Sequence, residues 1–490
     1  MNTDTKRDHK EKSKTLLGAN QKQKMGAQRS ELLRVLTSGG DERIRLLENG
    51  KNKYSVNPVD FEHSIQRGSC TCNTLNPDSM KAVGCLLNET RQSDFTTLLE
   101  RVRDEMKSMI SPDEEDSFEL FLAPSGSDLN YYPLMFRALL EKRRPILNIA
   151  TCPEELGTGS TFAAEGKYFF TQNQFGEVVD KGSKLPGIGE IQMKYFPSRD
   201  EEGMIFDHKS ALVEHLGKRD KSTLTICNLV LGSKSGIENN LSVIPRFQKN
   251  VMWVVDMCQM RAQKNTIQRL LDLNAMIMIT GSKFFQSPPF CGALLVPKYW
   301  IDRLSEVDDM SAAKSFTSIF SKNDFPPSLE RLRSVFRHYE NSGLLLRWGA
   351  ALSEMKAITA MDLEKILEMV DRWHEVVTGQ IRRRKDGFTL MPDGDMTNKT
   401  IISFKVKDRN GEYLGDEQHR KIFNYLAEHT FPELGYKNLI IGQPVSYDSE
   451  SFIRLAIGSY NIRTFLKDGL DPQFEEGVVD VIYRTARQLY

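Results

Sequence analysis

The sequence lacks long apolar runs, an excess of charge and a secretory leader. No segment reaches the roughly 18 uninterrupted apolar residues that a membrane-spanning helix needs. The first thirty residues are polar and lysine-rich, without the apolar core of a signal peptide. The 66 basic and 66 acidic residues cancel to a formal net charge of zero, so the overall charge does not indicate nucleic acid as a partner. We therefore expect a soluble protein that binds neither membranes nor nucleic acids.

Cysteine is also scarce. The 490 residues include seven cysteines, an odd number, without the repeated CxxC spacing of a zinc site. This usage favours a reducing compartment, here the cytoplasm, over a disulfide framework. Cys70 and Cys72 form the only close pair in the sequence. Because metal sites need further ligands at defined spacing, we expect two loop thiols there and no bound metal.

Composition and periodicity divide the chain into five segments. Residues 1–30 are polar and basic, as in a disordered tail, and residues 31–91 form an N-terminal segment. Residues 92–300 alternate short apolar runs with amphipathic stretches and are expected to form a large α/β domain. Residues 301–380 are typical of long helices. Residues 381–490 combine strand and helix patterns, as in a smaller C-terminal α+β domain.

The alternation in the large domain predicts a mostly parallel sheet covered by helices on both faces. Strands are expected at residues 118–123, 145–150, 222–231, 251–256, 275–280 and 292–297. Helices are expected at residues 129–143, 237–249 and 262–273. Such a sheet places its binding site at the carboxyl ends of its strands.

Two charged residues follow neighbouring strands of this predicted sheet. Asp256 ends the strand 251–256, and Lys283 lies three residues beyond the strand 275–280, so both are expected at one edge, facing one ligand. A lysine amine forms a Schiff base with an aldehyde, and an aspartate keeps a pyridine nitrogen protonated so that the ring accepts electrons. The pair therefore indicates pyridoxal phosphate as cofactor. Taken singly, Lys283 has the alternative of a surface lysine, and Asp256 that of a helix N-cap.

A phosphate-binding loop is predicted after the strand 118–123, where the sequence reads "PSGSD". Gly126 lets the backbone approach an anion closely, and the hydroxyls of Ser125 and Ser127 donate hydrogen bonds beside the amides of a helix N-terminus. The same letters also form an ordinary helix cap. The motif supports a phosphate site because it occurs together with Asp256 and Lys283.

A family resemblance rests on several motifs in chain order. "APSGSD", "VVDMCQ", "ITGSK" followed by "CGALLV", and "FIRLAIGSYN" resemble fold-type I pyridoxal-phosphate enzymes, in the branch of class V aminotransferases and cysteine desulfurases. The resemblance extends over residues 90–465. It implies that Lys283 is the Schiff-base lysine and Asp256 the partner of the pyridine nitrogen. It also implies a homodimer with active sites near the subunit interface.

The resemblance implies roles for further residues. Gln259 matches the glutamine that hydrogen-bonds the phenolic oxygen of the ring, Thr280 matches a hydroxyl that contacts the phosphate, and Ser282 is a weaker neighbour. Arg454 matches the arginine that grips the substrate carboxylate, a task that suits its planar fork. A structural ion pair is the alternative for Arg454, and Arg463 is the second candidate for the substrate role.

The sequence departs from the family pattern in three places. The branch often has a histidine over the cofactor ring, but "NIATCPEELGTGSTFAAEG" contains none, and we interpret its glycines as a flexible turn rather than a ligand loop. The extended "FFQSPPF" after the lysine is expected to shape substrate access. No cysteine occurs after Cys291, and Cys258 is expected to pack as a small hydrophobe. The persulfide chemistry of the desulfurases is therefore not expected.

The sequence thus predicts a pyridoxal-phosphate enzyme that acts on an amino acid or related amine, with transamination as the first choice. A lyase is one alternative, because the pocket decides whether the same carbanion undergoes elimination or side-chain cleavage. A non-catalytic protein that keeps the cofactor or the fold as a scaffold is another. A catalytically silent scaffold would not need all four of Lys283, Asp256, Gln259 and Arg454, which argues against this alternative.

Overall fold

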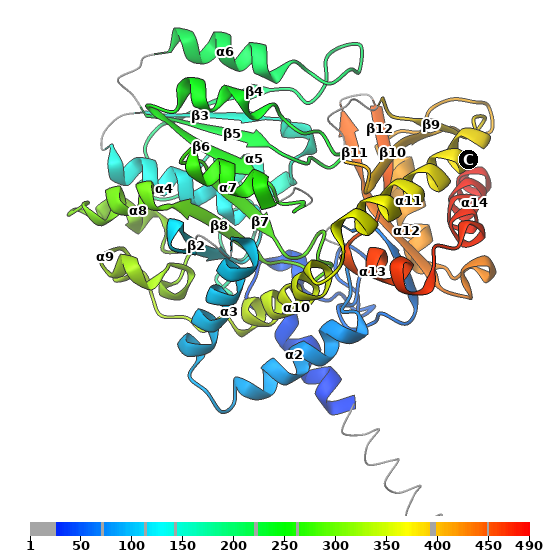
Figure 1. Cartoon of the computed structure of the whole chain (residues 1–490), viewed down its shortest axis with the longest axis horizontal. Helices are drawn as coiled ribbons and strands as arrows, with labels where there is room; N and C mark the ends of the chain where they lie inside the picture. The colour runs from blue at the N-terminus through cyan, green and yellow to red at the C-terminus, as the bar shows by residue number, and fades with distance from the viewer. Residues whose placement is uncertain are drawn as a thin grey trace, which may run out of the picture.

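The computed structural model describes residues 26–69, 73–111, 115–141, 145–219, 224–260, 264–392, 398–447 and 450–490. The chain forms a large α/β unit and a smaller α+β unit, with helices α10 (Ser342–Thr359) and α11 (Leu363–Arg383) leading from one to the other (Figure 1). Most of the predicted tail 1–30, and the pair Cys70 and Cys72, lie outside the described residues. None of the described helices is both long and apolar enough to cross a membrane.

The large unit is built on a seven-stranded sheet. In spatial order its strands are β2 (Phe118–Ala123), β8 (Gly292–Pro297), β7 (Met276–Thr280), β6 (Val251–Asp256), β5 (Thr225–Val230), β3 (Ile146–Thr151) and β4 (Ile191–Phe196). Neighbours pair in parallel from β7 to β4, and among these strands only β8 runs against the rest, between β2 and β7. The predicted mostly parallel sheet is confirmed.

Apolar cores lie on opposite faces of this sheet because side chains alternate along each strand. Leu120 and Leu122 of β2 join the core against α2, α3, α7 and α10. Phe121 of the same strand joins the core against α4 and α8. The helices of the large unit are α2 (Pro77–Glu89), α3 (Phe95–Ile110), α4 (Tyr131–Leu140), α5 (Thr158–Ala164), α6 (His208–Lys218), α7 (Lys264–Asp272), α8 (Lys298–Ser305) and α9 (Glu330–Arg333).

The small unit has a five-stranded sheet in the order β1, β11, β12, β10, β9. Strand β1 (Ser64–Arg67) comes from the N-terminal segment and pairs in parallel with β11 (Asn438–Tyr447). The other pairs are antiparallel. The remaining elements are β9 (Phe388–Leu390), β10 (Ile401–Val406), β12 (Glu450–Ala456), α12 (Asp416–Glu428), α13 (Ser459–Asp468) and α14 (Pro472–Leu489). The small unit is therefore α+β, as expected, and is completed by a strand from far upstream.

The prediction of a helix at residues 237–249 was wrong. This segment contains only two short 3-10 turns, Leu241–Val243 and Pro245–Phe247. Pro245 has no N–H for a helical hydrogen bond. The Asn240 side chain accepts a hydrogen bond from the Ser242 amide at 3.0 Å, a local bond that competes with helix formation.

Candidate active site

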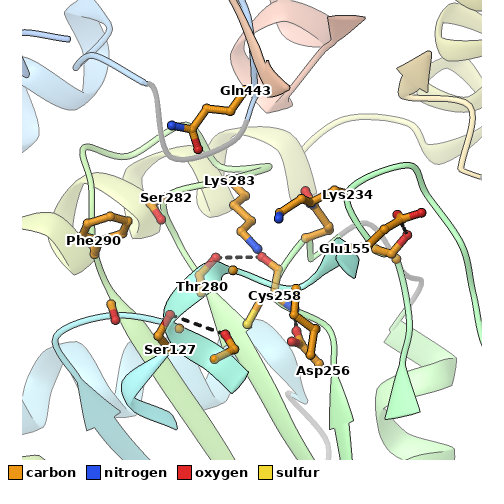
Figure 2. A pocket seen from close by; sticks show the side chains of 18 of the residues that line it. Ser127, Glu155, Lys234, Asp256, Cys258, Thr280, Ser282, Lys283, Phe290 and Gln443 are labelled. Atoms are coloured by element: carbon orange, nitrogen blue, oxygen red, sulfur yellow. Dashed lines mark hydrogen bonds between the residues drawn. The ribbon is translucent and has the colours of Figure 1, made fainter. Parts of the chain in front are cut away.

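The structure brings all nine residues proposed from the sequence into the lining of one cavity of about 240 Å³. They are Ser125, Gly126, Ser127, Asp256, Gln259, Thr280, Ser282, Lys283 and Arg454. The cavity lies where the carboxyl ends of β6 and β7 meet residues of the small unit such as Gln443 (Figure 2). This is the edge at which an open parallel sheet binds its ligands.

Asp256 and Lys283 converge because their strands are parallel neighbours. Asp256 is the last residue of β6, which pairs in parallel with β7, and Lys283 lies three residues past the end of β7. One Asp256 oxygen, Oδ1, accepts a hydrogen bond from the Cys258 amide at 2.9 Å. The Lys283 side chain extends toward the cavity floor near Asp256 and Cys258 (Figure 2). Within the described part of the chain its amine has neither an ion pair nor a hydrogen bond.

The loop Ser125–Gly126–Ser127 packs closely against the end of β7. A Cβ atom on Gly126 would lie 2.9 Å from Thr280 Cγ2 and 3.2 Å from Cys258 Sγ, so the loop can approach β7 this closely only without a side chain at that position. The Ser127 side chain makes no capping hydrogen bond to the helical turn that follows, and its Oγ lies 3.4 Å from Ser160 Oγ. Backbone and hydroxyl donors therefore gather at one end of the cavity.

A buried charged cluster holds Ser125. The Arg43 guanidinium donates a hydrogen bond to Ser125 Oγ at 3.1 Å, and that hydroxyl donates to Asp128 Oδ2 at 2.7 Å. Arg43 also pairs with Asp41 at 2.7 Å. Burial, assisted by the Asp41 carboxylate, raises the pKa of Asp128 to about 7. No sequence pattern indicates Arg43, which stands 82 residues from Ser125.

Thr280 and Cys258 are committed to local packing. The Thr280 hydroxyl donates to the Cys258 carbonyl at 2.7 Å, so its oxygen keeps acceptor capacity while its proton is used within the protein. Cys258 is buried in the core against α4. Burial and the nearby Asp256 carboxylate raise the pKa of the Cys258 thiol well above its ordinary value. The expectation that Cys258 packs as a small hydrophobe is confirmed.

The two candidate arginines differ in their surroundings. Arg454, on β12, is 4% exposed and donates hydrogen bonds to the carbonyl oxygens of Lys234 (2.9 Å) and Gln443 (3.1 and 3.3 Å). No described carboxylate pairs with it, so the structural ion pair considered for this residue is absent from the described chain. Arg463 pairs instead with Glu354 at 2.6 Å and Asp78 at 2.9 Å and does not line the cavity.

The glycine-containing stretch after β3 is not only a turn. Gly157 is the N-cap of α5, and Glu155, Leu156, Gly157 and Ser160 line the cavity. Glu155 is 2% exposed. Its carboxylate accepts hydrogen bonds from the hydroxyls of Ser233, Ser235 and Tyr447 and from the Ser235 amide. Sequence reasoning missed Glu155 because its partners lie in other loops.

The extended "FFQSPPF" segment links the lysine loop to the small unit. Gln286 Oε1 accepts hydrogen bonds from the amides of Tyr460 and Asn461, at the start of α13, at 3.1 and 3.4 Å. Phe290 lines the cavity and packs under the Arg43 guanidinium, 4.4 Å from its ring centre. The segment therefore both shapes the cavity wall and anchors a helix of the small unit.

Comparison with known proteins gives matches among solved structures. A NifS-like protein from Rickettsia africae ESF-5 has 11% identity and a TM-score of 0.54, with 86% of this chain and 99% of that chain covered. An alanine–glyoxylate aminotransferase from Nostoc sp. has 13% identity and a TM-score of 0.54, with 86% and 97% covered. Oryza sativa TDC, solved with PLP and tryptamine, has 11% identity and a TM-score of 0.52, with 89% and 84% covered.

No family model matches the sequence, and no curated protein matches it either. The structural matches extend over most of this chain at low identity, so they establish the fold. The chain has the type I fold of aminotransferases and NifS-like proteins. The resemblance inferred from the sequence motifs is thus confirmed at the level of the fold.

Proposed function

We propose that this protein is a pyridoxal-phosphate-dependent aminotransferase that acts on an amino acid or related amine. The observation that carries the proposal is the convergence of Lys283, Asp256 and Arg454 on one cavity. Lys283 offers an amine for an aldehyde, Asp256 an anion for a pyridinium nitrogen and Arg454 a cation for a carboxylate. The fold, shared with a structure solved with PLP, supports the same cofactor here.

The donor set fits the cofactor at both ends. Ser125, Gly126 and Ser127 offer hydroxyls and amides for the phosphate, with Thr280 and Ser282 beside them. Asp256 would hold the protonated ring nitrogen, and Gln259 would hold the phenolic oxygen. Once bound, the cofactor supplies an electron sink for the carbanion of the substrate.

The chain's own residues would position the substrate and move its proton. Lys283 would supply the amine that holds the aldehyde carbon of the cofactor, and the same amine would take the proton from the substrate α carbon. Arg454 binds the α-carboxylate and so fixes which bond faces Lys283.

A spectroscopic experiment tests this proposal. Purified protein incubated with pyridoxal phosphate should turn yellow, and borohydride should fix the cofactor onto Lys283. A panel of amino acids should then convert the cofactor to its pyridoxamine form, and a keto acid should reverse the change. Release of ammonia or of a side-chain fragment without that conversion would identify a lyase. A protein that stays colourless with added cofactor would refute the proposal.

Replacing Arg454 with alanine is expected to weaken substrate binding selectively. Charge-assisted hydrogen bonds contribute about 1.5–3 kcal/mol, so KM for carboxylate substrates should rise by roughly 10- to 100-fold. The absorption of the bound cofactor should persist, because Arg454 bonds only carbonyl oxygens in the described chain. Steady-state kinetics with the variant and with Arg454→Lys, which lacks the planar fork, measure the effect. Loss of cofactor from the alanine variant would contradict the assignment.

The proposal includes two further properties that the sequence predicts. One is the homodimer implied by the family resemblance, which sedimentation analysis of the purified protein would test. The other is a cytoplasmic location, which follows from the cysteine usage and would be tested by cell fractionation.

A further inference from the structure

Two of the hydroxyl protons at the proposed phosphate site are used within the protein. Ser125 Oγ donates to Asp128 Oδ2 at 2.7 Å, and Thr280 Oγ1 donates to the Cys258 carbonyl at 2.7 Å. A hydroxyl group has one proton to donate, so neither residue can donate to a phosphate while these bonds last. Because a phosphate group presents three strong acceptor oxygens, we expect further donors from another part of the chain.

Arg43 lies beside the loop Ser125–Gly126–Ser127 and lines the same cavity. Its Nη2 donates a hydrogen bond to Ser125 Oγ at 3.1 Å. Arg43 belongs to the short 3-10 turn Glu42–Ile44 in the N-terminal segment, so this side of the cavity is formed from outside the large sheet. An arginine side chain offers five N–H donors in a planar fork whose geometry matches a phosphate group.

The Arg43 guanidinium is fixed along one edge. Nε and Nη2 donate to the two carboxylate oxygens of Asp41, each at 2.7 Å, and the Arg43 amide donates to Asp41 Oδ1 at 2.9 Å. The guanidinium also packs against Phe169 and Phe290, whose ring centres lie 4.8 and 4.4 Å from Cζ. Since these contacts exist without a ligand, little side-chain entropy would be lost when a ligand binds.

The opposite nitrogen of the fork, Nη1, keeps its donors available. The hydrogen bonds of the Arg43 side chain within the described residues use Nε and Nη2. Nη1 makes none of them, yet it is not one of the fully buried atoms without a partner, so it is accessible on a side chain that is only 11% exposed. Asp41 balances the charge of Arg43, and what remains for a ligand is therefore a pair of charge-assisted donors.

We propose that Arg43 is a ligand of the cofactor phosphate. Nη1 donates to a phosphate oxygen, while Nη2 holds Ser125 in the loop whose amides bind the same group. The inference rests on the proposed function, because it requires pyridoxal phosphate to bind with its phosphate at this loop. It makes the N-terminal segment a part of the cofactor site.

A comparison of pyridoxal phosphate with pyridoxal isolates the contribution of the phosphate. Both compounds carry the aldehyde and the ring, so both should turn the parent protein yellow, and absorbance titration gives the ratio of their Kd values. Arg43→Gln should lower the preference for pyridoxal phosphate by about tenfold or more, the size expected for the loss of a charge-assisted hydrogen bond. Its affinity for pyridoxal should stay close to that of the parent. Arg43→Lys keeps a cation without the planar fork, and its preference should lie between the two.

Arg337→Gln is the matched control. Arg337 also pairs with a carboxylate, that of Glu177 at 2.6 Å, and packs against an aromatic ring, that of Phe175 at 4.3 Å, but it does not line the cavity. The control variant should therefore keep the preference of the parent protein.

The remaining outcomes separate the possible errors. If Arg43 only anchored the N-terminal segment, Arg43→Gln would weaken the binding of both compounds equally, and the unchanged ratio would overturn the inference. An unchanged ratio with a raised KM for the amino-acid substrate would also overturn it, because Arg43 would then bind the substrate. Should the glutamine variant not fold, a full preference in Arg43→Lys would have the same consequence. A parent protein that takes up neither compound overturns the proposed function and this inference together.

Discussion

Replacing Lys283 with alanine is expected to abolish covalent attachment of pyridoxal phosphate and to lower kcat by a factor on the order of 10²–10⁴ or more. In the proposed mechanism one amine would serve twice, as the group that holds the aldehyde carbon and as the base at the substrate α carbon. The side chain has no ion pair in the described chain, so its removal should leave the fold intact. Intact-mass measurement after borohydride treatment should find a cofactor adduct on the parent protein and none on the variant.

Lys53 and Lys234 also line the cavity, so the controls must distinguish the lysines. Lys53→Met and Lys234→Met should each keep the borohydride adduct, because the Schiff base is assigned to Lys283. Lys298→Ala removes an exposed lysine on α8 that pairs with Asp302 at 2.6 Å and should change neither adduct nor rate. Peptide mapping should place the adduct on Lys283. An adduct that survives in Lys283→Ala would reassign the reactive amine.

The strand-end residues of the site were predictable because local pattern and topology agree. A continuous apolar run predicts a buried strand, and parallel strands deliver the residues that follow them to one edge. Asp256 and Lys283 needed no more than this, whereas Thr280 was assigned from the family resemblance. Gly126 and its serines added a turn composition that repeats the chemistry of anion-binding loops.

Arg43 and Glu155 were not predicted because segments from distant parts of the chain bring their partners to them. Arg43 meets Ser125 across 82 residues, and Tyr447 meets Glu155 across 292. Such pairs leave no periodic pattern in the sequence. Lys234 lies in a loop whose serines donate hydrogen bonds to Glu155, a contact that only the folded chain reveals.

The same limit applies to parts of the fold. Strand β4 lies at the edge of the large sheet and alternates partly buried with exposed residues, among them Gln192 and Lys194. That pattern is weaker than the continuous apolar runs of the central strands. Strand β1 is only four residues long and pairs with β11, which lies hundreds of residues downstream. Its pairing follows from the docking of the small unit rather than from its own sequence.

Replacing Glu354 with alanine is expected to lower the free energy of unfolding by about 3–5 kcal/mol, the typical cost of removing one partner of a buried ion pair. Glu354 is fully buried on α10 and accepts hydrogen bonds from Arg463 (2.6 Å), Asn76 (2.9 Å) and Ser459 (3.0 Å). It therefore connects α10 to the N-terminal ends of α2 and α13. Its loss leaves Arg463 with Asp78 as its remaining ion-pair partner and removes the shared acceptor of Asn76 and Ser459.

Chemical denaturation of Glu354→Ala beside a surface control measures this effect. Glu105→Ala also removes a carboxylate that pairs with α10, through Lys356 at 2.7 Å, but both side chains are substantially exposed, so its cost should stay within about 0–1 kcal/mol. Glu354→Gln keeps the side-chain volume and one acceptor, so its loss of unfolding free energy should lie between those of the two alanine variants. A loss for Glu354→Ala no larger than that for Glu105→Ala would show that the three-helix junction does not depend on this carboxylate. If Glu354→Ala costs more than Glu105→Ala, Arg463 is a structural partner of Glu354. Of the two candidate arginines, Arg454 is then the one available to the substrate.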